Sequence, residues 1–269
     1  MIEQLSPGAT AANARVALFD FDGTLSTIRS GWVEVMVPMM VEILADLKTG
    51  EPEHELEALV KDFVGRLTGK QTMYQMIELA SEITKRGGTP KDPLEYKRMY
   101  LDLLWDRIKG RIDELRAGHC PPEKYMVPGS VDLLEALRER GLKMYLASGT
   151  DEVYMKEEAR LLGVDRYFDG GVFGALDDYM AFSKAILIQR IIQGAEARGD
   201  EFLGFGDGYV EIENVKQVGG VAVGVASDEP ECQKVDEWKR NRLAGVGADY
   251  IVPNYLCRKD LWTRLFPAG

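Results

Sequence analysis

Cysteine and histidine are scarce in this sequence of 269 residues. The three cysteines, Cys120, Cys232 and Cys257, are odd in number, lie far apart and form no CxxC pair. This pattern argues against a disulfide framework and against a zinc site, so reduced thiols are expected. The two histidines, His54 and His119, are isolated along the chain, and neither is assigned to chemistry.

The sequence also lacks a long uninterrupted apolar run. The N-terminal stretch MIEQLSPGATAANAR has no apolar core of the signal-peptide type. The most apolar stretch, residues 32–47, is interrupted by Glu34, Pro38, Glu42 and Asp46. Neither secretion nor membrane insertion is indicated, and a cytoplasmic location is expected.

Positive charge is in deficit. The chain has 33 lysines and arginines against 44 aspartates and glutamates, which gives a formal net charge of -11. Such a charge would repel a phosphate backbone, so nucleic acid is not expected as a partner. An anionic substrate would need a local positive site, which a divalent cation could provide. Apolar residues make up 45% of the chain, enough for a substantial core.

Five short apolar runs have the near-continuous pattern of strands that are buried on both faces. They cover residues 16–20, 142–148, 201–207, 220–227 and 249–252. Amphipathic helices are expected between them, over residues 130–140, 151–162, 183–198, 210–218 and 229–243. This alternation predicts an α/β fold with a parallel sheet covered by helices on both faces.

The long interval between the first two strands has helical spacing instead. Apolar residues recur at i, i+3 and i+4 over residues 56–67, 73–83 and 96–115. With residues 32–47, they predict about four helices. We expect a core domain made of residues 1–26 and 126–269, with a helical domain, residues 27–125, inserted after the first strand.

Polar residues finish several of the predicted strands. Asp20, Ser148 and Asp207 do so. In an open parallel sheet the ligand binds outside the carboxyl ends of the strands, where these residues lie. In the stretch FDFDGTL, Asp20 and Asp22 are two residues apart, so their side chains point the same way along extended backbone. One carboxylate could attack while the other handles a proton. Gly23 would let backbone amides approach an anion, and Asp207 would allow Mg²⁺ to lie between carboxylates and phosphate.

Four segments resemble, in order and context, the four motifs of the haloacid dehalogenase-like superfamily, specifically its phosphatase branch. They are VALFDFDGTL, MYLASGT, AFSKAILI and FLGFGDGYVE. The resemblance spans residues 16–226 and is strong in the α/β part. It implies a Rossmann-like parallel-sheet core with an inserted all-α cap domain.

The resemblance also implies roles for the residues of the first two motifs. Asp20 would be the nucleophile and form an aspartyl-phosphate. Asp22 would protonate the leaving oxygen and then activate water. Thr24 and Ser148, with backbone amides near Gly149, would hold phosphate oxygens.

The third and fourth motifs imply the charged part of the site. Lys184 would offset the charge of Asp20 and of the phosphoryl group. Asp207 would ligate Mg²⁺ together with Asp20 and the backbone carbonyl of Asp22. Where the family commonly has a second aspartate, this chain has Glu211, which either contributes to the metal site, directly or through water, or supports Lys184.

The inserted helical domain resembles the caps of this superfamily, which close over the site and supply substrate contacts. Arg29, near the hinge, and Arg66, Lys70 and Gln71, near a turn between helices, are the residues expected to contact substrate. The expected activity is Mg²⁺-dependent hydrolysis of a small phosphate ester, such as a sugar or polyol phosphate.

Three other functions stay open at this point. A phosphomutase would use the same four motifs and return the phosphoryl group to substrate. A phosphonate hydrolase would need a cap lysine for an imine, for which Lys70 is available. A protein that binds phosphorylated metabolites without turnover would keep the same residues. Dehalogenase chemistry is disfavoured, because dehalogenases of the superfamily lack the second aspartate of the first motif, here Asp22.

Overall fold

The computed structural model describes residues 2–176 and 184–267. Contacts divide the chain into two compact units. The core unit comprises residues 1–30 and 111–269, and the helical unit comprises residues 31–110. The helical unit thus lies within the predicted insertion, 27–125, and is shorter at both ends.

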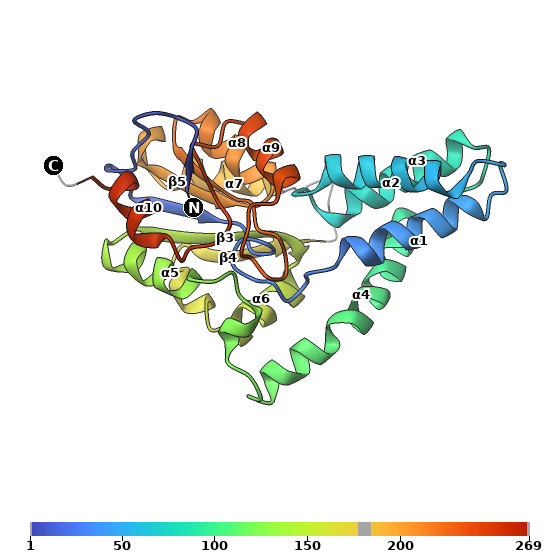
Figure 1. Cartoon of the computed structure of the whole chain (residues 1–269), viewed down its shortest axis with the longest axis horizontal. Coiled ribbons are helices and arrows are strands. Elements are labelled where there is room, and N and C mark those ends of the chain that lie inside the picture. Colours follow the sequence, from blue (N-terminus) through green and yellow to red (C-terminus); the bar gives the residue numbers. More distant parts are fainter. Residues whose placement is uncertain (1, 177–183, 268–269) are drawn as a thin grey trace. The chain divides into compact units, whose positions relative to one another are not determined.

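The core unit is built on a seven-stranded sheet in the order β1-β7-β6-β5-β2-β3-β4 (Figure 1). Every neighbouring pair is parallel except β1 with β7, which is antiparallel. The strands are β1 (Glu3–Gln4), β2 (Val16–Phe19), β3 (Lys143–Asp151), β4 (Gly171–Ala175), β5 (Phe202–Gly206), β6 (Val221–Val225) and β7 (Tyr250–Val252).

Helices cover both faces of this sheet. In Figure 1, α7, α8 and α9 lie over one face, and α5 and α6 lie over the other. The helices are α5 (Ser130–Glu139), α6 (Glu152–Leu161), α7 (Lys184–Gly194), α8 (Tyr209–Gln217), α9 (Glu237–Gly245) and α10 (Arg258–Leu265), and the short 3-10 turns are Pro122–Tyr125, Asp165–Tyr167 and Gly199–Glu201. Val16 and Leu18 of β2 pack in one apolar cluster with Leu187 and Ile188 of α7. The predicted α/β sandwich is confirmed.

The register of the central strands brings Asp20 and Asp207 to one edge of the sheet. Phe19 of β2 pairs with Phe205 of β5, and their rings stack with centroids 4.5 Å apart. Asp20 follows β2, and Asp207 follows β5 directly. The amide of Asp20 donates to the carbonyl of Phe205 at 2.9 Å. Both carboxylates therefore leave the sheet at its carboxyl edge.

All five predicted strands are present, and the structure adds two. β1 has two residues, too few for a periodic pattern to be visible in the sequence. β4 has the sequence GVFGA, in which two glycines lower the apparent strand propensity. The sequence also gave no sign of α10 at the end of the chain.

One predicted helix is wrong over its first eight residues. The helix expected over 229–243 begins only at Glu237, where the Asp236 carboxylate accepts the amide of Lys239 at 2.8 Å and caps it. The Asp228 carboxylate accepts the amides of Gln233 and Lys234, both at 2.7 Å, and so holds the preceding segment as a loop. The helix expected over 183–198 corresponds to α7, and its first residue, Ser183, lies outside the described residues.

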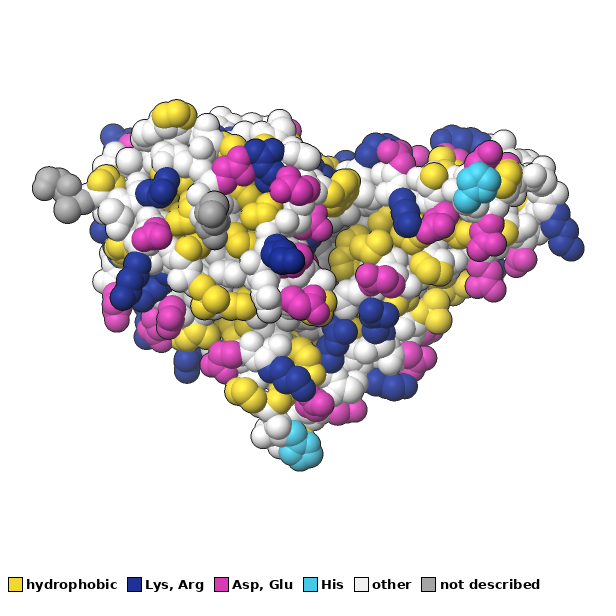
Figure 2. Space-filling view, in the orientation of Figure 1, with side chains coloured by type: hydrophobic (Ala, Val, Ile, Leu, Met, Phe, Trp, Pro, Cys, Tyr) yellow, Lys and Arg dark blue, Asp and Glu magenta, His cyan; other side chains and the backbone are white. Residues whose placement is uncertain are grey.

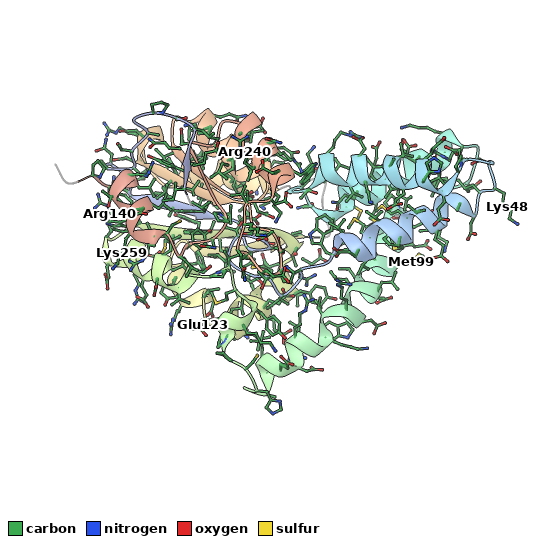
Figure 3. The ribbon with its side chains drawn as sticks, viewed as in Figure 1. Lys48, Met99, Glu123, Arg140, Arg240 and Lys259 are labelled. Atoms are coloured by element: carbon green, nitrogen blue, oxygen red, sulfur yellow. The ribbon has the colours of Figure 1, made fainter. Side chains whose placement is uncertain are left out.

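The four helices predicted between the first two predicted strands are present, and they lie between β2 and β3. They are α1 (Val33–Ala45), α2 (Glu53–Leu67), α3 (Thr72–Lys85) and α4 (Pro93–Arg116), and α4 runs on past residue 110 into the core unit. Met40, Val60, Met76 and Leu79 are at most 1% exposed, so the apolar stripes form an interior. Figure 3 labels Lys48, just after α1, and Met99 on α4. No helix within residues 2–176 and 184–267 is both long and apolar enough to cross a membrane.

Candidate active site

The turn that follows β2 is held by its own backbone. The carbonyl of Phe21 accepts the amides of Thr24, Leu25 and Ser26 at 3.3, 2.9 and 3.0 Å. Gly23 has a φ of +71°, a conformation that glycine adopts without steric cost. A Cβ at this position would lie 2.2 Å from Oδ2 of Asp207, so the site also needs glycine for the close approach of that carboxylate.

Asp20 is buried against a lysine. Its Oδ1 accepts hydrogen bonds from Nζ of Lys184 and from the amide of Phe21, both at 2.7 Å. Lys184 also forms an ion pair with Oε1 of Glu211. Asp20, Lys184 and Glu211 are 4%, 4% and 0% exposed. A buried cation is thus shared between two carboxylates from different elements.

The protonation of this buried group reflects both burial and charge. Burial raises the pKa of the Asp20 carboxyl well above its usual range, Lys184 opposes the shift, and Glu211 and Asp207 add to it. Burial alone would lower the pKa of Lys184, but Asp20 and Glu211 raise it above its ordinary value. The two carboxylates thus favour the charged form of Lys184 beside Asp20.

Asp22 has different surroundings from Asp20. Its Oδ2 accepts the hydroxyls of Ser148 and Thr150 at 3.1 and 2.8 Å. The amide of Thr150 in turn donates to Oγ of Ser148 at 3.0 Å. Within the described part of the chain, Oδ1 of Asp22 is buried and has no hydrogen-bond partner. Asp22 is thus held by one oxygen and presents the other.

The second predicted motif differs from its expected placement. Ser148 and Gly149 do not end a strand, because β3 continues to Asp151. The pairing of β3 with β4 shifts register between Ala147 and Asp151, and this irregularity lies where Ser148 and Thr150 turn toward Asp22. Thr150 was missed in the sequence, although it follows Ser148 by two residues and so shares its side of the strand.

Asp207 is fixed by the turn after β2. Its amide donates to Oγ1 of Thr24 at 2.9 Å, and Tyr255 donates its hydroxyl to the carbonyl of Thr24 at 3.0 Å. Thr24 is fully buried. The hydroxyl predicted to hold phosphate therefore already accepts a bond that places Asp207.

Two charged residues at this edge were not found in the sequence. Nζ of Lys239 lies 3.1 Å from Oδ2 of Asp207 and 2.5 Å from Oε1 of Glu229. Ser30 donates its hydroxyl to Oε2 of Glu229 at 2.7 Å. The signal was the acidic pair that follows β6, since β6 is the neighbour of β5 and ends at the same edge of the sheet.

The residues at this edge fit a magnesium ion. Mg²⁺ keeps several waters and is usually held by one or two carboxylates with substrate phosphate, through oxygen ligands. Asp20 and Asp207 would supply the carboxylates, and the carbonyl of Asp22 a third oxygen. Among the described residues, no group of three or more acidic, cysteine or histidine side chains is gathered as a ready-made metal cluster. Two ammonium groups lie among these carboxylates: Lys184 contacts Glu211, and Lys239 contacts both Asp207 and Glu229.

Arg29 lies in the core unit and is engaged in a buried ion pair. Its Nε is 3.1 Å from both carboxylate oxygens of Glu158, and its Nη2 is 2.6 Å from Oε1. Burial raises the pKa of Glu158, and Arg29 opposes that shift. Arg29 was predicted to contact substrate, but its guanidinium joins the segment after β2 to α6.

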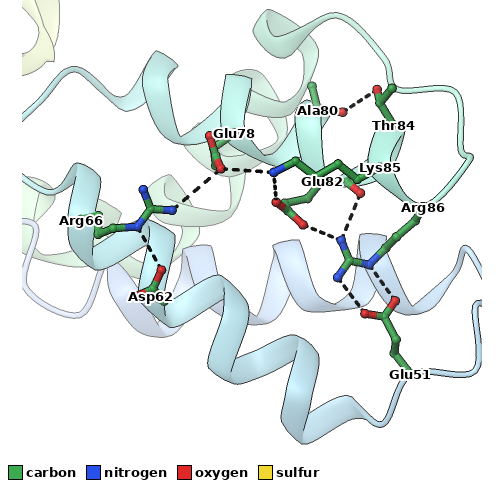
Figure 4. A network of polar contacts seen from close by, with 9 residues as sticks. All are labelled: Glu51, Asp62, Arg66, Glu78, Ala80, Glu82, Thr84, Lys85 and Arg86. Carbon is green, nitrogen blue, oxygen red and sulfur yellow. Dashed lines mark hydrogen bonds and ion pairs between the residues drawn. The ribbon is translucent and has the colours of Figure 1, made fainter.

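The other predicted substrate residues, Arg66, Lys70 and Gln71, belong to the helical unit. Arg66 forms ion pairs with Asp62 at 3.0 Å and with Glu78 at 3.9 Å (Figure 4). Nζ of Lys70 lies 5.4 Å from the ring centroid of Tyr74. Gln71 precedes α3 and is 3% exposed.

The surface carries charges of both signs. Figure 2 shows basic and acidic side chains interspersed on the face in view, with the cyan histidines exposed. Both His54 and His119 are exposed and outside the site just described.

The chain is similar to one known protein family. The family model described as hydrolase, haloacid dehalogenase-like hydrolase, matches residues 14–219. No curated protein matches the chain.

Solved structures share the fold at low sequence identity. A predicted phosphoglycolate phosphatase from Haemophilus somnus 129PT has a TM-score of 0.59 and 14% identity, covering 93% of this chain and 98% of that one. A predicted phosphatase from Clostridium acetobutylicum has a TM-score of 0.56 and 18% identity, covering 92% and 98%. A HAD family hydrolase from Deinococcus radiodurans R1, solved with bound phosphate and sodium, has a TM-score of 0.54 and 16% identity, covering 96% and 100%.

Proposed function

Because the chain belongs to the haloacid dehalogenase-like hydrolase family, we propose that it is a magnesium-dependent phosphatase that hydrolyses a small phosphorylated metabolite. One observation carries the proposal. Asp20 and Asp22 leave the same strand into different surroundings, Asp20 beside the Lys184 ammonium and Asp22 beside two hydroxyls with one oxygen bare. Two carboxylates in unlike environments suit a nucleophile and a proton carrier.

In the first step, an oxygen of Asp20 attacks the phosphorus of the substrate. Oδ1 already accepts two hydrogen bonds, so we assign the attack to Oδ2. The bond between phosphorus and the ester oxygen breaks, and the carboxylic acid of Asp22 gives its proton to that oxygen as the alcohol leaves. The products are an aspartyl-phosphate on Asp20 and a carboxylate on Asp22.

In the second step, water attacks the phosphorus of the aspartyl-phosphate. The water gives a proton to the Asp22 carboxylate, and the bond between phosphorus and the Asp20 oxygen breaks. Inorganic phosphate leaves, Asp20 is again a carboxylate, and Asp22 is again an acid. Ser148 and Thr150 hold the oxygen of Asp22 that does not carry the proton.

Charge neutralisation is the other requirement of phosphoryl transfer. Lys184 supplies a fixed positive charge beside Asp20, and Glu211 holds that ammonium in place. A bound Mg²⁺, held by Asp20, Asp207 and the Asp22 carbonyl, would offset the charge of the phosphoryl oxygens. We further propose that Thr24 and the Gly149 amide bind those oxygens, and that Ser148, whose single hydroxyl proton is donated to Asp22, acts through Asp22 instead.

We propose that the helical unit is a cap that selects the substrate, through Arg66, Lys70 and Gln71. A sugar or polyol phosphate is the class that such polar side chains suit. Arg29 is assigned a structural role instead, because its guanidinium is bound by Glu158 on α6.

The test is hydrolysis of p-nitrophenyl phosphate by the full chain with MgCl₂. We expect turnover in the wild type, its loss on chelation with EDTA, and its loss in Asp20→Asn. Asp165→Asn is the matched control, since it makes the same change at an exposed position, and it should keep wild-type activity. Turnover that survives Asp20→Asn would remove Asp20 as the nucleophile.

A phosphomutase is separated from a phosphatase by the fate of the phosphoryl group. When a labelled aspartyl-phosphate is formed from substrate and chased with a mixture of sugar phosphates, a phosphatase releases the label as inorganic phosphate. A mutase transfers it to the sugar. Absence of both turnover and labelling with every phosphate ester tried would instead favour a binding protein.

A further inference from the structure

A second lysine, Lys239, lies among the carboxylates at the edge of the sheet. It is the third residue of α9, and its ammonium is 3.1 Å from Oδ2 of Asp207 and 2.5 Å from Oε1 of Glu229. The side chains of Asp207, Lys239 and Glu229 are 13%, 15% and 16% exposed, so solvent screens this group only weakly. The ammonium is therefore enclosed by two carboxylates at close range.

This group touches the turn that carries the proposed catalytic residues. A Cβ on Gly23 would lie 2.2 Å from Oδ2 of Asp207 and 2.8 Å from Oε1 of Glu229. Oε2 of Glu229 accepts the hydroxyl of Ser30, so Glu229 is held from both sides. Glu229 is therefore a fixed second partner for Lys239 next to Asp207.

The ammonium and a magnesium ion would compete for the same carboxylate. Lys239 contacts Oδ2 of Asp207, and Asp207 is one of the two side chains that would hold the cation. A divalent cation near Asp207 is repelled by an ammonium a few ångströms away. Glu229 offers the ammonium another carboxylate at hydrogen-bond distance.

We propose that Lys239 is an internal competitor of Mg²⁺, which pairs with Asp207 in the absence of the cation and moves fully onto Glu229 when the cation binds. Lys239 thus weakens the binding of Mg²⁺, and Glu229 strengthens it. This inference rests on the magnesium site of the proposed function. The affinity for Mg²⁺ would then depend on Lys239 and Glu229, two residues outside the four motifs.

The test measures Mg²⁺ binding to the full chain by isothermal titration calorimetry with MgCl₂ alone. We expect Lys239→Met to lower the Kd at least tenfold, because the competing charge is gone. We expect Glu229→Gln to raise the Kd at least fivefold, because the ammonium then has only Asp207. In the double variant the competing ammonium is absent, so Glu229→Gln should lose its effect and the Kd should stay within threefold of that of Lys239→Met. Lys234→Met, at an exposed position in the preceding loop, is the matched control and should stay within twofold.

Thermal unfolding provides a second readout and reveals any failure to fold. Without Mg²⁺, Lys239→Met should melt below the wild type, because Asp207 and Glu229 lose their shared cation. With MgCl₂, its melting temperature should rise by more than that of the wild type. A Kd in Lys239→Met that is unchanged or raised would overturn the competition, as would tighter binding in Glu229→Gln.

The outcomes separate this inference from the proposed function. If the wild type binds Mg²⁺ and Asp207→Asn abolishes binding while Lys239→Met leaves the Kd unchanged, only the competition fails. If the wild type does not bind Mg²⁺ at all, the magnesium-dependent function fails and the competition fails with it.

Discussion

Asp20 and Asp22 are chemically identical side chains with different neighbours. Asp20 faces an ammonium and a backbone amide, whereas Asp22 faces the hydroxyls of Ser148 and Thr150. A hydroxyl can donate to a carboxylate and can also stay bonded to a carboxylic acid, so Asp22 keeps its position in either protonation state. An ammonium only donates, so Lys184 favours the ionised form of Asp20 and opposes the effect of burial.

The role of Asp22 can be tested with two leaving groups. In Asp22→Asn, kcat should fall by 10² to 10⁴, the usual contribution of acid and base help. The loss should be larger for phenyl phosphate than for p-nitrophenyl phosphate, because phenolate is the poorer leaving group and needs the proton more. Steady-state kcat on both esters is the measurement. A kcat within tenfold of the wild type on phenyl phosphate would exclude Asp22 as the acid.

Thr150 should matter through Asp22. Thr150→Val keeps the shape of the side chain and removes the bond of 2.8 Å to Oδ2 of Asp22. We expect kcat to fall about tenfold with little change in KM, since a net hydrogen bond to a charged group contributes about 1.5 kcal/mol. Thr263→Val, on α10, is the control, because its hydroxyl donates to the backbone carbonyl of Lys259 at 2.9 Å and lies at the surface. Equal loss in both variants would deny Thr150 a specific role.

At the scale of elements, α3 is tied to the loop before α2 by a charge network (Figure 4). Arg86, which follows α3, binds Glu51 through two bonds of 2.7 Å and binds the Glu82 carboxylate at 2.5 Å. Lys85 binds the other oxygen of Glu82 at 2.5 Å. The side chain of Glu82 is 8% exposed, so this pair is screened less than an ordinary surface pair.

Glu82→Gln should weaken the helical unit in a pH-dependent way. Burial alone would raise the pKa of Glu82, but Lys85 and Arg86 lower it below the ordinary value of 4.5. A lowered pKa in the folded state means that the ionised form stabilises the fold above about pH 4.5, and that this contribution is lost as the pH falls through the folded value. At pH 7 the variant should lose about 2 kcal/mol in the free energy of opening of α3, and the difference should shrink between pH 5 and pH 3.

Hydrogen exchange of the α3 amides provides the measurement. Glu78→Gln is the matched control, because Glu78 lies 3.9 Å from both Arg66 and Lys85 and is 30% exposed. Its effect should stay below about 1 kcal/mol. A pH-independent loss in Glu82→Gln would show that packing, not charge, is responsible.

At the scale of the whole molecule, cation binding should appear as stability. If Mg²⁺ binds the folded chain and not the unfolded chain, a concentration of 100 times the Kd raises the free energy of unfolding by about 2.7 kcal/mol. We expect the melting temperature measured by calorimetry to rise with MgCl₂ and to return after chelation. Asp207→Asn should remove most of this increase. The same increase in that variant would place the cation elsewhere.

The sequence predicted most of the fold because its strands are continuous apolar runs and its inserted helices have regular stripes. It predicted Asp20, Asp22 and Asp207 together because they lie where strands end, whereas Lys184 was predicted only from the resemblance of the third motif. It missed Glu229 and Lys239, which are ten residues apart in a loop and a following helix, and whose contact depends on the path of that loop. It misassigned this loop as helix, because the side-chain bonds of Asp228 and Asp236 compete with helical bonding there.

Arg111 joins the two segments of the core unit that flank the helical unit in the sequence. Its guanidinium donates to the carbonyls of Ile28 and Ser30 at 2.7 and 2.9 Å, so the last residues before the helical unit and the first residue after it are fastened together. The points of exit and re-entry are adjacent within one compact body, so we expect that a short glycine-serine bridge can replace the 80 residues of the helical unit, residues 31–110. Such a miniaturised chain should melt in one cooperative transition and cleave p-nitrophenyl phosphate while losing discrimination among larger esters. Arg111→Met in the shortened chain, but not in the full chain, should abolish that cooperativity.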